Sequence, residues 1–180
     1  MRWLTSERIP GAIIGAVAVS VRGKPRHTDD IDAVILGDDI GWERVVESAA
    51  RYGLVPRIED ALAFATRSRV LLLRHAASGV EVDVSLGVLP FERETIERST
   101  MVRVGALRLR LSSAEDLVIM KALARRPKDI ADIEGILDVH RDLDLNRIRR
   151  YLREFSSLLE MPEIHDDFEK LLRRKKKGQA

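Results

Sequence analysis

The sequence IGAVAVSVRGKPRHTDDIDAVIL, residues 14–36, carries the clearest structural signal in the chain. A glycine opens a short apolar segment, and a basic turn then leads to Asp30 and Asp32, at the start of an apolar run that ends at residues 37–39. Because this run is rich in β-favouring residues, residues 31–36 are predicted to form a strand. Side chains alternate across a strand, so Asp30 and Asp32 are expected on one face, about 7 Å apart.

Two neighbouring carboxylates on a mostly apolar strand indicate a cation site. Like charges repel each other, and burying them is costly unless a positive charge compensates them. Mg²⁺ binds through one or two carboxylates and completes its shell with water and substrate phosphates. The alternative is an ordinary turn in which Asp30 is only a capping residue.

A third carboxylate strengthens the metal interpretation. Residues 80–85, VEVDVS, alternate and are predicted to form another strand, with residues 70–73 as its antiparallel hairpin partner. If this strand lies beside residues 31–36, Asp83 joins Asp30 and Asp32. Three such carboxylates can hold two ions for an in-line phosphoryl-type displacement.

Hydrophobic periodicity predicts further elements along the chain. The expected helices cover residues 16–21, 41–52 with Gly53 closing the helix, 113–124 after a Ser112 cap, a stretch from Pro127 onward, 145–160 and 162–175. A first strand is expected at residues 9–14, and residues 90–100 show little periodicity. Residues 101–111 are predicted to form one half-exposed strand. Its outward arginines either discourage strand pairing or face a phosphate-rich partner.

The composition fits a soluble globular protein, with 45% hydrophobic and 33% charged residues among 180. The absence of cysteine excludes disulfides, cysteine nucleophiles and thiolate zinc sites, and only 4% aromatic residues argue against a base-stacking surface. Charges interrupt the N-terminal apolar residues early, and no apolar run reaches the ~20 residues that span a bilayer. We therefore expect no membrane association and a cytoplasmic location. Since the net charge is only +2, a basic partner surface has to be local, as at residues 173–177.

Eight positions in the opening stretch follow a family pattern: Gly15, Ala18, Gly23, Arg26, Thr28, Asp30, Ile31 and Asp32. Together with the later Asp83, they resemble the signature of the nucleotidyltransferase superfamily, which has the DNA polymerase β-like fold. The stretch is most similar to the AbiEii and MenT-like toxin branch of that superfamily. One position departs from the pattern. Ala16 replaces the second glycine, whose backbone approaches the nucleotide phosphates in the family.

The resemblance extends over about residues 10–136 and implies an α+β fold. That fold is a nucleotidyltransferase-type mixed β-sheet with flanking helices, followed by a C-terminal helical bundle. We expect residues 1–111 to form the catalytic core and residues 112–172 to form the helical region. Residues 173–180 are expected to be a basic tail without regular structure.

The resemblance also implies which residues form the site. The catalytic and metal-binding carboxylates would be Asp30, Asp32 and Asp83. The nucleotide-binding residues would be Gly15, Ala16, Arg26 and Thr28, together with Lys121 and Asp129 on two later helices. For these helix residues ordinary alternatives stay open, because Lys121 can extend to water beside an apolar stripe and Asp129 and Asp132 can complement a helix dipole.

The implied activity is the transfer of a nucleoside monophosphate from a nucleoside triphosphate (NTP) to an acceptor hydroxyl, with Mg²⁺ or Mn²⁺ as cofactor. The basic C-terminal residues and the outward arginines favour tRNA or another RNA as acceptor, while a small molecule or a protein stays open. In the resembled branch such enzymes are toxins, which implies a cognate antitoxin as partner. One alternative is a catalytically weak or inactive relative that binds nucleotide or RNA, which Ala16 supports and the three retained aspartates oppose. Another is a DNA-binding module formed by the C-terminal helices.

Overall fold

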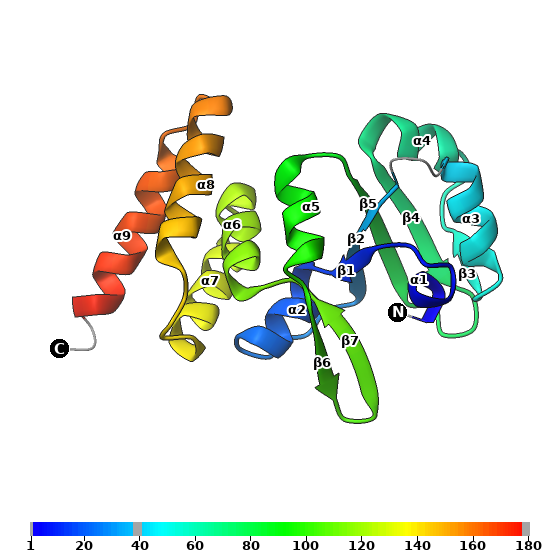
Figure 1. Ribbon diagram of the computed structural model, residues 1–180, viewed down its shortest axis with the longest axis horizontal. Helices are drawn as coiled ribbons and strands as arrows, with labels where there is room; N and C mark the ends of the chain where they lie inside the picture. The colour runs from blue at the N-terminus through cyan, green and yellow to red at the C-terminus, as the bar shows by residue number, and fades with distance from the viewer. Residues whose placement is uncertain (1, 38–40, 178–180) are drawn as a thin grey trace. The chain divides into compact units, whose positions relative to one another are not determined.

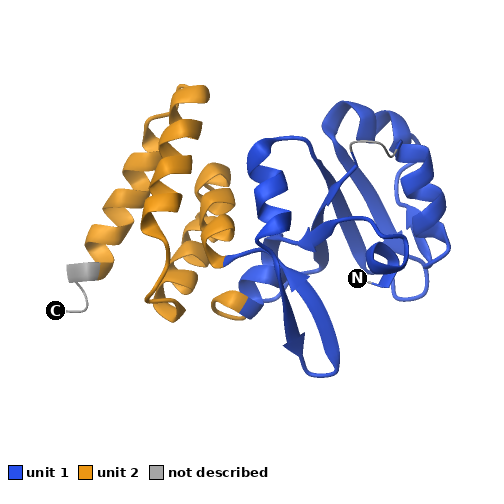
Figure 2. Cartoon of the chain, in the orientation of Figure 1, with its two compact units in different colours: residues 1–21, 26–113 blue, residues 22–25, 114–180 orange. Residues whose placement is uncertain are grey.

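The computed structural model describes residues 2–37 and 41–177, so Asp38 and Asp39, at the predicted end of the first strand, lie outside the described residues. The chain divides into two compact units (Figure 2). Unit 1 consists of residues 1–21 and 26–113, and unit 2 consists of residues 22–25 and 114–180. The basic turn at residues 22–25 therefore belongs to the helical unit, although the segments on both sides of it belong to the sheet unit.

Unit 1 is built on a mixed sheet that has seven strands in the described residues, in the order β3-β4-β5-β2-β1-β7-β6 (Figure 1). The strands are β1 Gly11–Ile13, β2 Asp30–Leu36, β3 Leu54–Pro56, β4 Val70–His75, β5 Glu81–Gly87, β6 Thr100–Val104 and β7 Leu107–Leu111. The predicted neighbourhood of the two acidic strands is confirmed, because β2 pairs with β5 in parallel. The predicted hairpin is confirmed as well, since β4 pairs with β5 antiparallel.

The two faces of this sheet differ in character because side chains alternate along each strand. One face carries the main apolar core, in which Ile35, Leu71, Leu73 and Val84 are buried. The helices that contribute residues to this core are α1 Arg2–Ser6, α3 Trp42–Ala50 and α4 Ala61–Ser68. The acidic residues of β2 and β5 occupy the alternate positions and therefore point to the opposite face.

The opposite face is covered in part by α5 Pro90–Glu97, whose Ile96 packs in a small buried cluster with Ala12 and Val34. The short helix α2 Gly15–Arg22 follows β1 directly, as the sequence predicted for residues 16–21. Helix α2 leads into the basic turn and then into β2.

Unit 2 is the predicted helical bundle. Its helices are α6 Ala114–Ala124, α7 Pro127–Val139, α8 Leu145–Leu158 and α9 Glu163–Lys177. Leu117, Ile133, Ile148 and Leu152 form its apolar interior and are all at most 1% exposed. The bundle also contains a buried ion pair, in which Arg147 Nη2 donates to Asp116 Oδ1 at 2.8 Å. In the described part of the chain, every helix is too short or too polar to cross a membrane.

Four predictions about local structure were wrong or incomplete. Residues 101–111 form the hairpin β6–β7 and not one strand, because Gly105 adopts a positive φ of 59° and allows a tight turn. Residues 90–100 contain α5, whose first turn is stabilised by Glu92 accepting from the backbone N–H groups of Val88 and Leu89. The sequence also missed α1, β3 and α4, and it placed the first strand over a longer range than β1 occupies.

The expected basic tail is the remaining correction. Helix α9 continues through Lys177, whereas we predicted a segment without regular structure from residue 173. The reason is ion pairing with α7, because Arg174 pairs with Glu134 and Lys175 pairs with Asp138. Residues 178–180 lie outside the described residues.

Candidate active site

The acidic side chains of β2 and β5 share one face of the sheet. The parallel register places Asp32 opposite Asp83 and Asp30 opposite Glu81, and paired residues of neighbouring strands point to the same side. All these residues are partly exposed. The structure thus places the three carboxylates that the sequence selected on one face of the sheet, and it adds a fourth, Glu81.

Gly15 makes room for the carboxylate of Asp32. It adopts a positive φ of 61° at the start of α2, and a Cβ atom built on it would lie 1.8 Å from Asp32 Oδ2. The adjacent Ile14 N–H donates to the main-chain oxygen of Asp32 at 2.9 Å. The Asp32 side chain therefore lies against the N-terminal end of a helix, where free N–H groups and the helix dipole favour a negative charge. Ala16, which replaces the second glycine of the family pattern, is buried.

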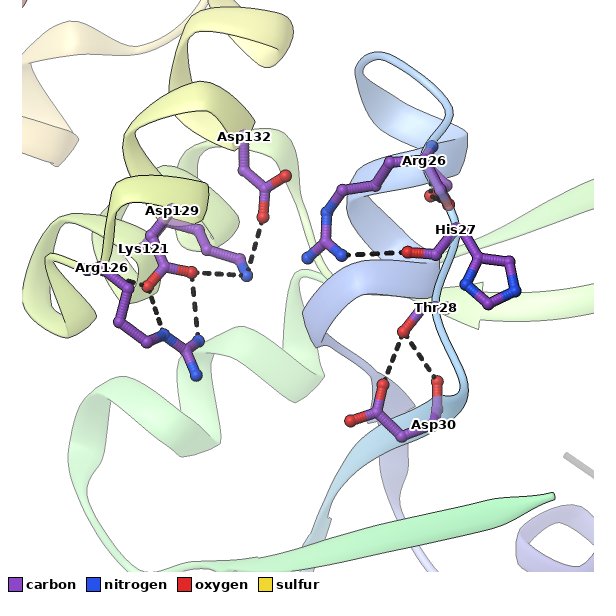
Figure 3. A network of polar contacts seen from close by, with 9 residues as sticks. Arg26, His27, Thr28, Asp30, Lys121, Arg126, Asp129 and Asp132 are labelled. Atoms are coloured by element: carbon purple, nitrogen blue, oxygen red, sulfur yellow. Dashed lines mark hydrogen bonds and ion pairs between the residues drawn. The ribbon is translucent and has the colours of Figure 1, made fainter.

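Two further predicted residues lie in the segment before β2 (Figure 3). Thr28 Oγ1 donates to Asp30 Oδ1 at 2.5 Å, so the hydroxyl orients this carboxylate. Arg26 Nη1 donates to the main-chain oxygen of His27 at 3.2 Å, and its backbone N–H donates to Ser20 Oγ at 3.3 Å. These contacts fix the segment that carries Asp30.

The sequence analysis missed Arg57, which follows directly after β3. Its Nη1 lies 3.0 Å from Glu81 Oε2, and its Nη2 donates to Asp83 Oδ1 at 2.7 Å. The hydrogen bond with Asp83 raises the pKa of Arg57, and the charges of Asp83, Glu81 and Asp30 raise it further against the opposing effect of burial. The local sequence does not predict this contact, because β3 has only three residues, one of which is proline, and therefore shows no strand periodicity.

The donor chemistry of this face suits Mg²⁺, which prefers carboxylate oxygens. Within residues 2–37 and 41–177, however, no three His, Cys, Asp or Glu side chains stand together in an arrangement that could hold a metal ion. One reason is visible in the contacts, because Asp83 and Glu81 are turned toward the guanidinium of Arg57. The carboxylates have the ligand chemistry that a divalent cation needs, and they share one face of the sheet. In this structure the guanidinium of Arg57 compensates two of them, Glu81 and Asp83.

In unit 2, Lys121 lies at the centre of a separate buried network (Figure 3). Its Nζ lies 2.9 Å from Asp129 Oδ1 and 2.9 Å from Asp132 Oδ2, and Lys121 is only 6% exposed. Asp129 Oδ2 also accepts from the backbone N–H and the Nε of Arg126 at the start of α7. The alternative in which Lys121 extends to water is therefore wrong. The contacts show these residues binding one another within the helical unit.

The pKa of Asp129 reflects this network. Burial pushes the pKa upward, but the hydrogen bonds from Arg126 and Lys121 outweigh burial and lower it from 3.8 to about 2. The carboxylate therefore stays ionised inside the protein and stabilises the junction of α6 and α7.

A groove of about 1120 Å³ lies elsewhere in unit 1, between α1, the β3–β4 end of the sheet and the β6–β7 hairpin. Arg2, Arg108, Arg110 and His75 line it, and Tyr52 contributes a half-buried aromatic ring. None of the described residues that line this groove is acidic. The outward arginines of residues 101–111 thus border a concave, basic surface.

Comparison with known proteins gives a family. Residues 4–175 match the family described as "Nucleotidyltransferase of unknown function (DUF6036)". No curated protein matches the sequence. The match supports the nucleotidyltransferase resemblance, while none of these comparisons supports the AbiEii and MenT-like branch.

Several solved structures have a similar fold. The solution structure of the antibiotic-resistance factor ANT(2'')-Ia is 15% identical, with a TM-score of 0.58 over 92% of each chain. An antigenic nucleotidyltransferase-like protein from Paracoccidioides brasiliensis is 17% identical, with a TM-score of 0.57 over 94% of this chain and 87% of that chain. The lincosamide antibiotic adenylyltransferase LnuA, bound to lincomycin, is 11% identical, with a TM-score of 0.53 over 76% of this chain and 91% of that chain. At these identities the similarity establishes the fold alone.

The contact between Gly15 and Asp32 yields a stability prediction. Gly15→Ala should destabilise the protein by about 1–3 kcal/mol more than Gly79→Ala. Both glycines have a positive φ, but a Cβ at Gly79 meets nothing within 4 Å. The double variant Gly15→Ala/Asp32→Ala should recover most of the difference, because the colliding carboxylate is gone. Urea unfolding of the four proteins measures this, and equal losses at both glycines would show that the Asp32 side chain moves aside freely.

The network around Asp129 yields a pH prediction. Because the folded pKa of about 2 lies below the ordinary value of 3.8, the ionised carboxylate contributes its full stability above about pH 4 and loses it as the pH falls toward 2. At pH 7, Asp129→Asn should therefore be less stable than the wild type by about 2 kcal/mol, and the difference should shrink between pH 4 and pH 2. Asp142→Asn, at an exposed position, is the matched control. A constant difference across this range in urea unfolding would contradict the assignment.

Proposed function

The chain belongs to the nucleotidyltransferase family DUF6036, and we propose that it transfers a nucleoside monophosphate from an NTP to an acceptor hydroxyl with the help of a divalent cation. The observation that carries this proposal is the register that sets Asp32 beside Asp83 on an open face of the sheet. Neighbouring carboxylates repel each other, which costs free energy. Such an arrangement can bind a divalent cation, alone or together with a phosphate group.

Asp30, Asp32 and Asp83 are the residues that would hold Mg²⁺ or Mn²⁺, and the bound cation would neutralise charge on the triphosphate. The first N–H groups of α2, at Gly15 and Ala16, would donate to phosphate oxygens, since a helix N-terminus favours anions. Thr28 keeps Asp30 in place, and Arg26 supplies a positive charge in the segment before β2. We leave Lys121 and Asp129 out of the nucleotide site, because their charged groups bind each other inside unit 2.

The chemistry that these residues perform is positioning and charge compensation. A carboxylate on the acidic face accepts the proton of the acceptor hydroxyl, and the hydroxyl oxygen attacks the α-phosphorus as the bond to pyrophosphate breaks. Holding the two reactants in line removes a large part of the entropic barrier. Fixed positive groups around the phosphates stabilise the charge of the leaving pyrophosphate.

For the acceptor we propose an RNA, with tRNA as the first substrate to test. The acid-free groove lined by Arg2, Arg108 and Arg110 supports this choice, because arginines bind the phosphate backbone without the need for base stacking. A small-molecule hydroxyl is the second candidate. It is favoured by the fold shared with ANT(2'')-Ia, whose structure is known with adenylyl-2''-tobramycin, and with LnuA. Transfer to tRNA would also motivate a test for growth arrest and for a cognate antitoxin.

The catalytic role of the acidic face is tested by Asp32→Asn. We expect the variant to lose at least about 100-fold in transfer of label from α-³²P-labelled ATP, CTP, GTP or UTP, because one charge for phosphate–cation binding is gone. Its thermal midpoint should stay equal to or slightly above that of the wild type, since carboxylate repulsion is relieved. Glu47→Gln, at an exposed position of α3, is the control. Full transfer activity in Asp32→Asn would remove the proposed site, and labelling of tobramycin or lincomycin in place of tRNA would select the small-molecule acceptor.

The RNA acceptor is tested by binding without nucleotide. The double variant Arg2→Ala/Arg108→Ala should bind fluorescein-labelled tRNA about tenfold more weakly. The slope of log Kd against log salt should also fall by about 1–2, because two phosphate contacts are lost. The control is Arg44→Ala/Arg67→Ala, which removes two exposed arginines from α3 and α4. Equal weakening in both double variants would indicate unspecific attraction and contradict a role for the groove.

A further inference from the structure

We propose that Arg57 is a positioning residue that competes with the divalent cation for Asp83 and thereby sets the cation concentration at which the acidic face becomes occupied. This inference rests on the proposed function, since it concerns the same carboxylates. No sequence pattern indicated Arg57. Without a bound cation, Arg57 is the counter-ion of Glu81 and Asp83.

The position of Arg57 is fixed by the sheet. Its backbone N–H donates to the main-chain oxygen of Leu72 at 3.1 Å, directly after β3, which pairs antiparallel with β4. The side chain is 22% exposed, and its Nε is buried without a hydrogen bond among the described residues. Both terminal nitrogens therefore carry the polar contacts, one with Glu81 and the other with Asp83. The guanidinium is held across the two acids of β5.

Charges of both signs meet on this face. Asp30, Asp32, Glu81 and Asp83 place four carboxylates on one face of β2 and β5. Arg74 of β4 stands opposite Glu81, and Arg57 contacts both Glu81 and Asp83. The raised pKa of Arg57 has the same origin, with the Asp83 hydrogen bond as its largest cause. An arginine stays protonated at all relevant pH values, so this counter-ion is permanent.

Arg57 and a divalent cation would compete because both bind the carboxylate of Asp83. Asp83 Oδ1 accepts from Arg57 Nη2 at 2.7 Å, and a carboxylate oxygen of Asp83 is also what a cation on this face needs. Two like charges a few ångströms apart repel each other strongly at a partly desolvated surface. A cation bound to Asp83 would therefore lie close to the positive guanidinium that already holds this carboxylate, so removal of the guanidinium should tighten cation binding. A residue with a merely structural role would not produce tighter binding.

The experiment measures Mn²⁺ binding to the full chain without nucleotide, from the electron paramagnetic resonance signal of free Mn²⁺. Arg57→Gln should bind Mn²⁺ about tenfold more tightly than the wild type. Arg57→Lys keeps the charge but loses the two-point contact, so its affinity should lie between the two. Arg67→Gln, at an exposed position of α4, should leave the affinity unchanged.

Thermal melting supplies a second measurement that does not depend on catalysis. Without a divalent cation, Arg57→Gln should melt at a lower temperature than the wild type, because the acids of β5 lose their counter-ion. Addition of Mg²⁺ should remove this difference, since the cation then compensates the same charges. In an Asp83→Asn background, Arg57→Gln should change Mn²⁺ affinity by less than about threefold, because the shared ligand is gone.

The outcomes separate this inference from the proposed function. If the wild type binds Mn²⁺ and Asp32→Asn weakens that binding, the cation site stands, and unchanged or weaker binding in Arg57→Gln then overturns only the role of Arg57. If neither the wild type nor Arg57→Gln binds Mn²⁺ and Asp32→Asn retains full transfer activity, the proposed function itself fails. A gain in affinity that is the same with and without Asp83 would show that Arg57 acts through general charge and not through this carboxylate.

Discussion

The parallel pairing of β2 with β5, which places several carboxylates on one face of the sheet, is the constraint around which unit 1 is arranged. The parallel ladder fixes the backbone of Asp32 beside that of Asp83, so the two carboxylates can move apart only by side-chain rotation. The surrounding segments are arranged accordingly. The start of α2 gives Asp32 a helix N-terminus and a glycine without a side chain, and the end of β3 delivers a guanidinium to Asp83. In the proposed reaction, these carboxylates would hold the divalent cation that neutralises the triphosphate. The shared face of β2 and β5 therefore connects the fold with the proposed chemistry.

In unit 2, charged side chains are buried and paired with one another. Lys121 and Asp129 are buried and bound to each other, and the carboxylate is held ionised by its donors, with a pKa of about 2. Arg147 and Asp116 form a second buried pair. A buried, paired network of this kind specifies how helices pack, because breaking it leaves an uncompensated charge. The acids of β2 and β5 are partly exposed, and for that reason we propose the ligand-binding role for them.

Much of the fold could be predicted because its main strands carry local signals. Alternation over residues 80–85 and the apolar run after Asp32 identified β5 and β2, and the helical period identified α3 and α6. The misses have physical causes. Strand β3 has three residues and ends in proline, so it has no period to detect. Helix α5 has only eight residues and is rich in charge, so its apolar period is weak, although its capping contacts are local. The hairpin around Gly105 was read as one strand because both arms share the same alternation.

The common face of Asp30 and Asp32 follows from sequence, because the period of a strand is a local property. Asp83 shares that face only because β5 pairs with β2 in parallel. Gly15 was selected by the family pattern, and the structure adds the reason for a glycine there, namely a positive φ and the carboxylate of Asp32 against its backbone. The contact of Arg57 with Asp83 and the burial of Lys121 were decided by tertiary structure alone. Arg57 and Asp83 are 26 positions apart, and the side chain of Arg57, after β3, reaches across β4 to β5. That order of strands depends on packing of the whole sheet. Local residue patterns contain no information about which distant charge will compensate a given carboxylate.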